Sequence, residues 1–121
     1  MSTKVEKFED LMVWQNAVEL SVGVCSALKD CRDYSLKDQM VRSSVSIPSN
    51  IAEGFERQYN KEFIQFLFVA KGSAGELRNQ LLIAFKLGFL NEVKFDDLTD
   101  QNRKVSAQLF NLIKTRKEKF S

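Results

Sequence analysis

The side chains of this chain that could carry out chemistry are carboxylates and cysteines, because the sequence contains no histidine. Without histidine, Ser–His and Cys–His nucleophile systems and histidine-ligated metals are excluded, as are the Glu-x-x-His pairs of di-iron bundles. Glu53, Glu62 and Glu76 could in principle exchange protons, but nothing pairs them at a diagnostic spacing. We interpret each as half of a salt bridge or as a solvated charge. With no glycine loop of the P-loop or dinucleotide type either, the sequence predicts no enzyme, cofactor or metal.

The two cysteines, Cys25 and Cys31, lie six residues apart on a predicted helix, which turns them to different faces so that they cannot bridge each other. We expect both to be small buried hydrophobic residues rather than metal ligands. No apolar run approaches the ~20 residues of a membrane-spanning helix, and the N-terminus lacks the hydrophobic segment of a secretory signal. The expected location is the cytosol, with no membrane partner.

Cationic side chains are spread unevenly along the chain. Lys and Arg total 18 against 16 Asp and Glu, a net charge of +2 that is too mild to imply nucleic acid by itself. The last 21 residues, however, are rich in cations, including Arg103, Lys104, Lys114, Arg116 and Lys117. One interpretation is a solvated last helix with cations favourably placed near its C-terminus; the other is a basic patch that binds phosphate. No basic stretch is interleaved with aromatic residues in the manner of single-strand binders.

Four helices would have to position these side chains, over about residues 11–28, 35–58, 61–87 and 92–117. Asp10, Ser35 and Asn60 are the predicted N-caps of the first three. The last helix is expected to start near Asn91, and Gly88 fits the position just after the third. Because short connections make consecutive helices antiparallel, the predicted fold class is all-α, an antiparallel up-down-up-down four-helix bundle. It forms a single domain over 1–121, with 1–9 as a flexible N-terminus.

The third predicted helix carries more apolar surface than one bundle needs. Its main stripe alternates by four and three residues, as in a coiled-coil seam, and consists of Phe63, Leu67, Ala70, Ala74, Leu77, Leu81 and Ala84. Gly72 and Gly75 lie mid-helix, where each costs about 1 kcal/mol relative to Ala, a cost that close approach of another helix would offset. Soluble monomers avoid large exposed apolar patches. We therefore predict a homo-oligomer with the first and third helices in the interface; the alternative is a monomer with a generous core.

Pro48, within VSIPSNIAEGFER at residues 45–57, interrupts the second predicted helix. A proline lacks the N–H and clashes with the preceding turn, so the helix must kink or restart there. In the second case Ser46 would cap a new helix starting near Pro48. In the first case, the hydroxyls of the four surrounding serines could bond the freed carbonyls.

Three segments carry a resemblance to a known family: FEDLMVWQNA at 8–17, LKDQMVRSSVSIPSNIAEGFER at 36–57, and KEFIQFLFVAKGSAGELRNQLLIAFKLGFL at 61–90. Together they resemble the bacterial four-helix bundle proteins, also called 23S rRNA intervening-sequence proteins. The resemblance implies antiparallel bundles, with one kinked second helix, that assemble as ring-shaped homopentamers without enzymatic activity or cofactor. The family is also similar to the accessory variability determinant of diversity-generating retroelements, a basic pentamer that binds a reverse transcriptase and nucleic acid.

The matching segments contain the candidate contacts to RNA or DNA phosphates: Arg42, Arg57, Lys61, Lys71 and Arg78. For each of them an ordinary salt bridge or a solvated charge is the competing interpretation. Two functions follow. The first is a homo-oligomeric, nucleic-acid-associated accessory protein, in which a five-fold ring would repeat each modest basic patch. The second is a protein–protein interaction scaffold that does not bind nucleic acid.

Overall fold

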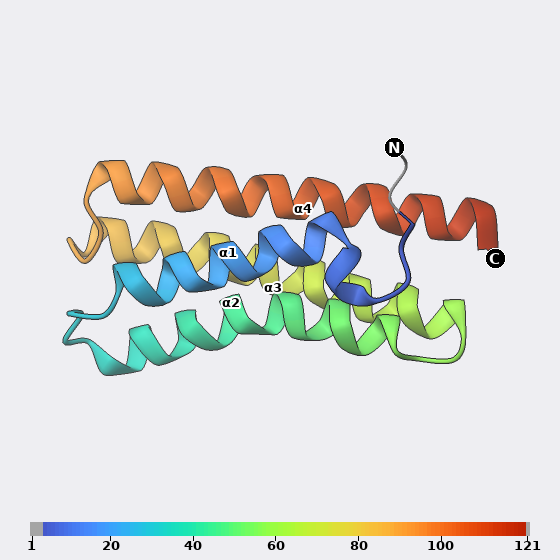
Figure 1. The fold of residues 1–121 in the computed structure, drawn as a ribbon. Helices are drawn as coiled ribbons and strands as arrows, with labels where there is room; N and C mark the ends of the chain where they lie inside the picture. The colour runs from blue at the N-terminus through green and yellow to red at the C-terminus, as the bar shows by residue number, and fades with distance from the viewer. Residues whose placement is uncertain (1–3, 121) are drawn as a thin grey trace.

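The computed structural model describes residues 4–120, which contain helices and no strand. A short 3-10 helix, η1 (Phe8–Asp10), precedes α1 (Met12–Ala27), α2 (Tyr34–Phe55), α3 (Asn60–Lys86) and α4 (Glu92–Phe120). Each long helix runs back along the one before it, and α4 returns to pack against α1, so that every helix contacts its two neighbours (Figure 1). This arrangement confirms the all-α, up-down-up-down four-helix bundle. The observed helix ends lie within three residues of the expected ones.

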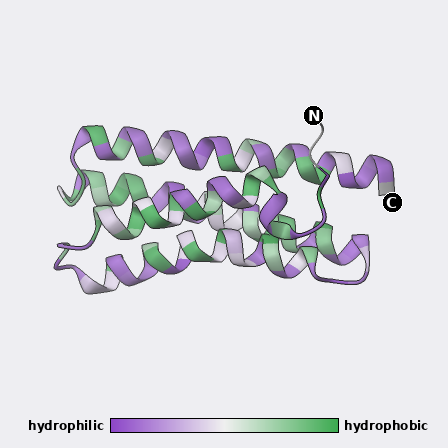
Figure 2. Cartoon of the chain, in the orientation of Figure 1, coloured by the Kyte–Doolittle hydropathy of each residue, from purple (hydrophilic) through white to green (hydrophobic). Residues whose placement is uncertain are grey.

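The hydrophobic core receives buried apolar residues from all four long helices. Hydrophobic and hydrophilic residues alternate along the helices (Figure 2). All seven residues of the predicted α3 stripe are buried, which confirms the heptad interpretation. The α4 stripe consists of Leu98, Val105, Leu109 and Ile113. Each fully buried Leu or Val contributes about 1.5–3 kcal/mol relative to exposure.

In α1, the buried stripe is formed by Val13, Ala17, Leu20 and Val24. Cys25 follows Val24 by one residue, which rotates it by about 100° around the helix and leaves it exposed. The prediction that Cys25 is buried is therefore wrong, whereas Cys31 is buried as expected. Both cysteines are free thiols.

Three helix starts differ from the predicted caps. Asp33, not Ser35, caps α2, since its Oδ1 accepts the backbone N–H of Leu36 at 3.0 Å. Asp10 does not cap α1; its carboxylate accepts the backbone N–H of Glu6 at 3.0 Å, within the segment that leads into η1. This hydrogen bond lowers the pKa of Asp10. Of the N-terminal residues expected to be flexible, 1–3 lie outside the described residues.

The N-cap of α3 is Tyr59 rather than Asn60, whose side chain contacts α4 instead. Two other expectations for helix ends are confirmed. Gly88 follows α3 with a φ of 84°, the left-handed conformation that favours glycine after a helix. Asn91 precedes α4, and its Oδ1 accepts the backbone N–H of Lys94 at 2.8 Å.

Pro48 lies inside α2, which is assigned as one helix from Tyr34 to Phe55, so the interpretation of two separate helices is wrong. The nearby serines do not act as expected. Pro48 frees the carbonyl of Ser44, yet the Ser44 hydroxyl donates to the carbonyl of Val41 at 2.9 Å. The Ser46 hydroxyl lies 2.8 Å from that of Ser73, which joins α2 to α3. The kink at Pro48 stays a prediction.

The closest approach at a glycine is at Gly54 rather than at mid-α3. A Cβ at Gly54 would lie 2.6 Å from the Cβ of Phe66, so α2 and α3 can pack this tightly only with glycine there. At Gly72 and Gly75, a Cβ would have no described atom within 4 Å. The expectation that a helix closely approaches these two glycines therefore fails within the single chain.

Candidate functional site

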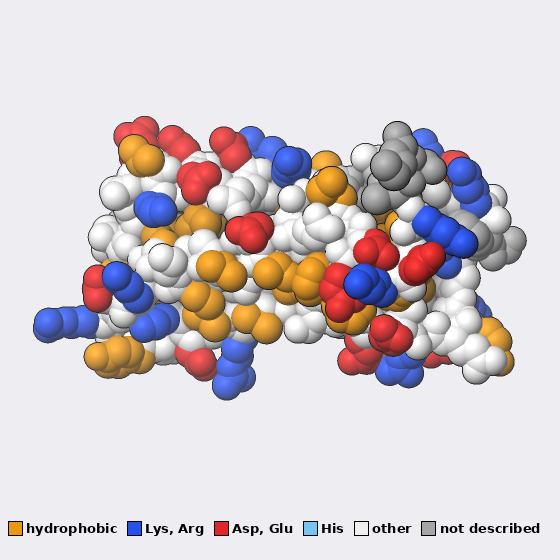
Figure 3. Space-filling view, viewed as in Figure 1, with side chains coloured by type: hydrophobic (Ala, Val, Ile, Leu, Met, Phe, Trp, Pro, Cys, Tyr) orange, Lys and Arg blue, Asp and Glu red, His pale blue; other side chains and the backbone are white. Residues whose placement is uncertain are grey.

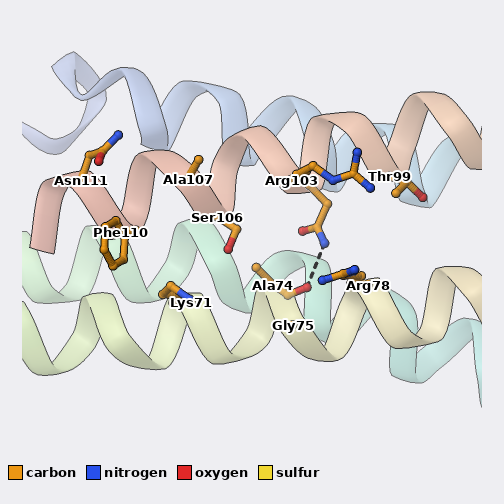
Figure 4. A pocket seen from close by; sticks show the side chains of 11 residues that line it. Lys71, Ala74, Gly75, Arg78, Thr99, Arg103, Ser106, Ala107, Phe110 and Asn111 are labelled. Carbon is orange, nitrogen blue, oxygen red and sulfur yellow. Dashed lines mark hydrogen bonds between the residues drawn. The ribbon is translucent and has the colours of Figure 1, made fainter.

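A hollow of 460 Å³ lies on the outer side of the seam between α3 and α4, and we call it the α3–α4 groove (Figure 4). The side chains that line it come from both helices: Lys71, Ala74, Gly75, Arg78, Thr99, Asn102, Arg103, Ser106, Ala107, Phe110 and Asn111. The spacing of residues explains the shared face. Lys71, Gly75 and Arg78 are four and three residues apart, and Thr99, Arg103, Ser106 and Phe110 repeat the same pattern on α4.

The groove continues along the seam toward the N-terminal end of α3. Phe110 also lines a smaller hollow of 230 Å³, together with Phe68, Ile113, Lys114 and Lys117. Phe68 and Lys117 in turn line a third hollow of 610 Å³, which includes Lys61 and Ile64. Cations are thus distributed along the whole seam: Lys61, Lys71, Arg78, Arg103, Lys114 and Lys117.

Positive charge dominates the central part of the groove, whose lining includes three cations and no carboxylate. Arg103 has one acidic neighbour, Asp100, at 3.7 Å, and both side chains are well exposed. Among the described residues, no carboxylate oxygen lies within 4.0 Å of a side-chain nitrogen of Lys71 or Arg78. An exposed pair such as Arg103–Asp100 neutralises little. Asp96 and Asp100 line the adjoining hollow, which Arg78 and Arg103 also border.

Two buried polar atoms that border the groove, one from Asn102 and one from the half-buried Thr99, have no hydrogen-bond partner among the described residues. Asn102 is only 3% exposed, and its Nδ2 donates to the carbonyl of Ala74 at 2.8 Å, which links α4 to α3 (Figure 4). Within the part of the chain that the structure describes, the Oδ1 of Asn102 and the Oγ1 of Thr99 have no partner. Buried polar atoms are rarely left unpaired, because each costs about 1–3 kcal/mol. Both oxygens are shielded from solvent, so a group that enters the groove could bond them only after a side-chain rotation.

Exposed aromatic rings lie beside the cations of the seam. This arrangement was not predicted from the sequence. Phe110 is 58% exposed and Phe68 is 48% exposed. The Lys117 ammonium lies 5.0 Å from the centroid of the Phe68 ring. No basic stretch interleaved with aromatic residues marks this arrangement in the sequence, because the two rings come from different helices. The available signal was weaker: Phe68 precedes Lys71 by three residues, and Phe110 precedes Lys114 by four.

Of the five residues predicted to contact phosphate, Lys61, Lys71 and Arg78 line the seam, and the other two do not. Arg42 lies on α2 and pairs with Asp38 at 3.2 Å. Arg57 follows α2, and its charge is already engaged by carboxylates of α2 and α3.

The contacts of Arg57 show why it is a poor candidate. Its guanidinium lies 3.0 Å from a carboxylate oxygen of Glu53 and 3.5 Å from one of Glu62. It also lies 4.9 Å above the ring of Phe66, so it serves to fasten the α2–α3 connection.

The C-terminal cations divide between two roles. Arg103, Lys114 and Lys117 line the seam, and Lys104 is exposed without lining it. Arg116 is structural: its Nε donates to the Oδ1 of Asn60 at 2.7 Å, and its guanidinium lies 5.0 Å from the Phe63 ring centroid. Burial lowers the pKa of the Arg116 guanidinium, because desolvation disfavours the charged form.

The described residues include no cluster of three or more acidic or cysteine side chains suited to hold a metal ion. Within the same residues, no helix has the length and apolar character needed to cross a membrane.

Comparisons with known proteins identify the family. A family model described as 23S rRNA-intervening sequence protein matches residues 9–111. The fold is similar to a crystal structure from Bacteroides thetaiotaomicron VPI-5482, described as a protein with unknown function from the S23 ribosomal protein family. That similarity has a TM-score of 0.79 at 22% sequence identity, over 84% of this chain and 95% of that chain. Comparison with curated proteins gives no match.

Neither description names an enzymatic activity, and the structural similarity at this identity shows the fold alone. The family match extends over most of the chain and agrees with the resemblance of its three sequence segments. The protein belongs to the 23S rRNA-intervening sequence protein family.

Proposed function

We propose that this protein is a non-enzymatic homo-oligomer, assembled as a ring of five chains, that binds RNA or DNA through the α3–α4 groove. The observation that carries the proposal is the lining of the groove: Lys71, Arg78 and Arg103 meet there without a carboxylate in the same hollow. Phosphate groups are the natural ligands of such a cluster of amines and guanidinium groups.

The small net charge of +2 does not oppose this proposal, because binding depends on the local arrangement of charge. Each phosphate contact lowers the slope of log affinity against log salt by about 0.7 for single strands and about 0.9 for duplexes. A ring would present the same groove on every chain, so a few contacts in each chain would act together on one nucleic acid.

Exposed apolar side chains support self-association. Val69 and Ile83 of α3 and its C-cap Leu87 are exposed and lie outside the groove. Hydrophobic side chains also gather on the surface where α1 and α2 meet (Figure 3), and Val22 and Val45 are exposed on these two helices. Patches of this kind mark interaction surfaces on soluble proteins. They favour the oligomer predicted from the sequence, with α1 and α3 in its interface.

The binding proposal is tested with the full chain and a short fluorescent RNA, titrated at salt concentrations from about 50 to 200 mM. The variant Lys71→Gln plus Arg78→Gln should weaken binding and reduce the salt slope by about 1.4 for each chain whose groove contacts a single-stranded RNA. Its matched control is Arg42→Gln plus Lys104→Gln, which removes the same charge away from the groove and should keep the slope. Equal effects of the two double variants, or no binding by the wild type at low salt, would refute the role of the groove.

Assembly is tested by light scattering at micromolar concentration, where the proposal requires the mass of a pentamer. A monomer mass would overturn it. Introducing lysine at Val69 and Ile83 should reduce the mass. Lysine at Val93, an exposed valine of α4 outside the groove, should not.

The second candidate function is a protein–protein scaffold without nucleic acid, favoured by the same exposed apolar side chains. A reverse transcriptase is the protein partner that the resemblance implies. An oligomer that binds such a protein but not RNA or DNA would support this function over the first.

A further inference from the structure

We propose that the nucleic acid bound in the α3–α4 groove is single-stranded, with a base stacked on Phe110 and neighbouring phosphates held by Lys71 and Arg78. This inference rests on the proposed function and adds the class of nucleic acid and the residue that selects it. Its starting point is the exposed ring of Phe110 at the boundary between the basic hollow and the apolar one.

Phe110 is 58% exposed on α4, and it is the one aromatic side chain that lines the 460 Å³ hollow. Its ring projects from α4 toward α3, on the same side as Lys71 (Figure 4). The exposed ring adds little to the stability of the bundle, because an apolar side chain stabilises a fold mainly when it is buried. A flat π-face beside cations is, by contrast, the arrangement that binds bases of single strands.

The hollow next to Phe110 has the lining that a base would need. Phe68 and Ile113 supply apolar surface, and the lysine side chains at its edge can cover apolar surface with their aliphatic stems. Lys117 lies over the Phe68 ring, whereas no ring or cation is found over Phe110 among the described residues. Phe110 therefore offers the more accessible ring of the two.

The polar side of the groove offers hydrogen bonds as well as charge. Asn102 is 3% exposed, and its Oδ1 has no partner within the described part of the chain. The Oγ1 of the half-buried Thr99 also has no partner there. Both residues line the hollow that contains Lys71 and Arg78. Both oxygens are shielded from solvent, so a side-chain rotation toward the hollow would be needed to bring them within reach of the exocyclic amino and ring N–H groups of an unpaired base.

A duplex would use this surface poorly. Its bases stack on one another and present no π-face to a protein, so only its phosphates could bind the cations. A single strand can place phosphates on Lys71 and Arg78 and a base on Phe110 at the same time. The groove should consequently prefer single strands over duplexes of the same sequence.

The test compares one mixed-sequence fluorescent oligonucleotide alone and annealed to its complement, titrated with the full-length protein. We expect the wild type to bind the single strand about tenfold or more tightly than the duplex, the effect of one or two stacked bases. Phe110→Ala should remove about tenfold of affinity for the single strand and leave the duplex within about twofold. The salt slope should not change, because no phosphate contact is lost.

Two further variants make the result specific. Phe110→Trp keeps an aromatic face and should retain the preference for the single strand. Val93→Ala shortens another exposed apolar residue of α4 outside the groove and should change neither affinity. Because the Phe110 ring is largely exposed, Phe110→Ala should keep the wild-type thermal unfolding curve, which circular dichroism can check.

The outcomes separate the two proposals. Equal affinity of the wild type for single strand and duplex, or an equal loss on both with Phe110→Ala, would overturn this inference and leave groove binding through phosphates intact. Failure of the wild type to bind either form at low salt would overturn both proposals and favour a protein partner for the groove.

Discussion

Replacing Gly54 by alanine should destabilise the protein although alanine is the better helix former. Gly54 lies near the end of α2, and an added Cβ would be 2.6 Å from the Cβ of Phe66 and 3.3 Å from the carbonyl oxygen of Phe63. Carbon atoms prefer separations of about 3.5–4.0 Å. Since one of these atoms belongs to the backbone and the other is bonded to it, neither can rotate away. The α2 and α3 helices would have to move apart by about 1 Å.

The expected loss follows from two opposing terms. Overpacking of a core costs about 1–3 kcal/mol, and the gain in helix propensity returns about 1 kcal/mol. Separation would also loosen the edge-to-face pair of Phe55 and Phe63, whose centroids are 5.9 Å apart. We therefore expect Gly54→Ala to lower the free energy of unfolding by about 1–2 kcal/mol. For a chain of 121 residues, that corresponds to a fall in Tm of about 3–10 °C.

Gly72→Ala provides the matched control, because it makes the same chemical change in the middle of α3. A Cβ there meets no described atom within 4 Å, so only the propensity gain remains. This variant should raise the free energy of unfolding by about 0.5–1 kcal/mol. The comparison removes any general effect of glycine-to-alanine substitution on the unfolded chain.

Thermal and urea unfolding, followed by circular dichroism, measure both changes. One fixed protein concentration is used, because any self-association would add to stability. A Gly54→Ala variant as stable as the wild type would refute the tight packing of α2 against α3. Destabilisation by Gly72→Ala would instead indicate that another copy of the chain lies against this glycine. The sequence predicts such a close approach, and the single chain does not supply it.

Substitutions at three further positions test local features. Asp33→Ala removes the N-cap of α2 and should lower the free energy of unfolding by about 1 kcal/mol in urea titrations, whereas Asp33→Asn should retain most of it. Asp10→Ala should be less stable than the wild type at pH 7. The hydrogen bond from the Glu6 N–H lowers the pKa of Asp10 below 3.8, so the stabilisation that the Asp10 carboxylate provides is present above that pH. The difference between variant and wild type should vanish as the pH falls through the lowered pKa. Asn102→Ala removes the link to the Ala74 carbonyl and should cost about 1–2 kcal/mol; no loss in urea titrations would show that this bond does not position α4 on α3.

The fold could be predicted from the sequence because its strongest signal is long and regular. The α3 stripe from Phe63 to Ala84 repeats over three heptads, and every member is buried. Helix ends were harder to predict, since several capping residues compete within a few positions. Asp33 and Ser35 are both good caps, and the structure selects Asp33. Asn60 does not cap α3, because its Oδ1 accepts a hydrogen bond from Arg116, 56 residues further along the chain.

The site could be predicted only in part, because contacts between distant parts of the chain decide which side chains face the groove. Lys71 and Arg78 are recognisable as cations on one face of a helix, and they do lie together in the groove. Arg57 has the same character in the sequence, but Glu62 of the next helix engages it. Phe110 and Asn102 belong to the groove because α3 packs beside α4, and no local pattern on α4 reveals that packing.

Self-association and groove binding make compatible demands on α3. The core stripe is satisfied within one chain, which leaves two other faces of the helix. Lys71 and Arg78 border the groove, whereas Ile83 and Leu87 are exposed outside it. At 100° per residue, Ile83 lies about 140° around the helix from Arg78. An interface that covers Ile83 and Leu87 would therefore leave the groove open on every chain. Assembly through that face would multiply the basic groove around the oligomer instead of occluding it, which is how a chain with a net charge of only +2 could bind a polyanion.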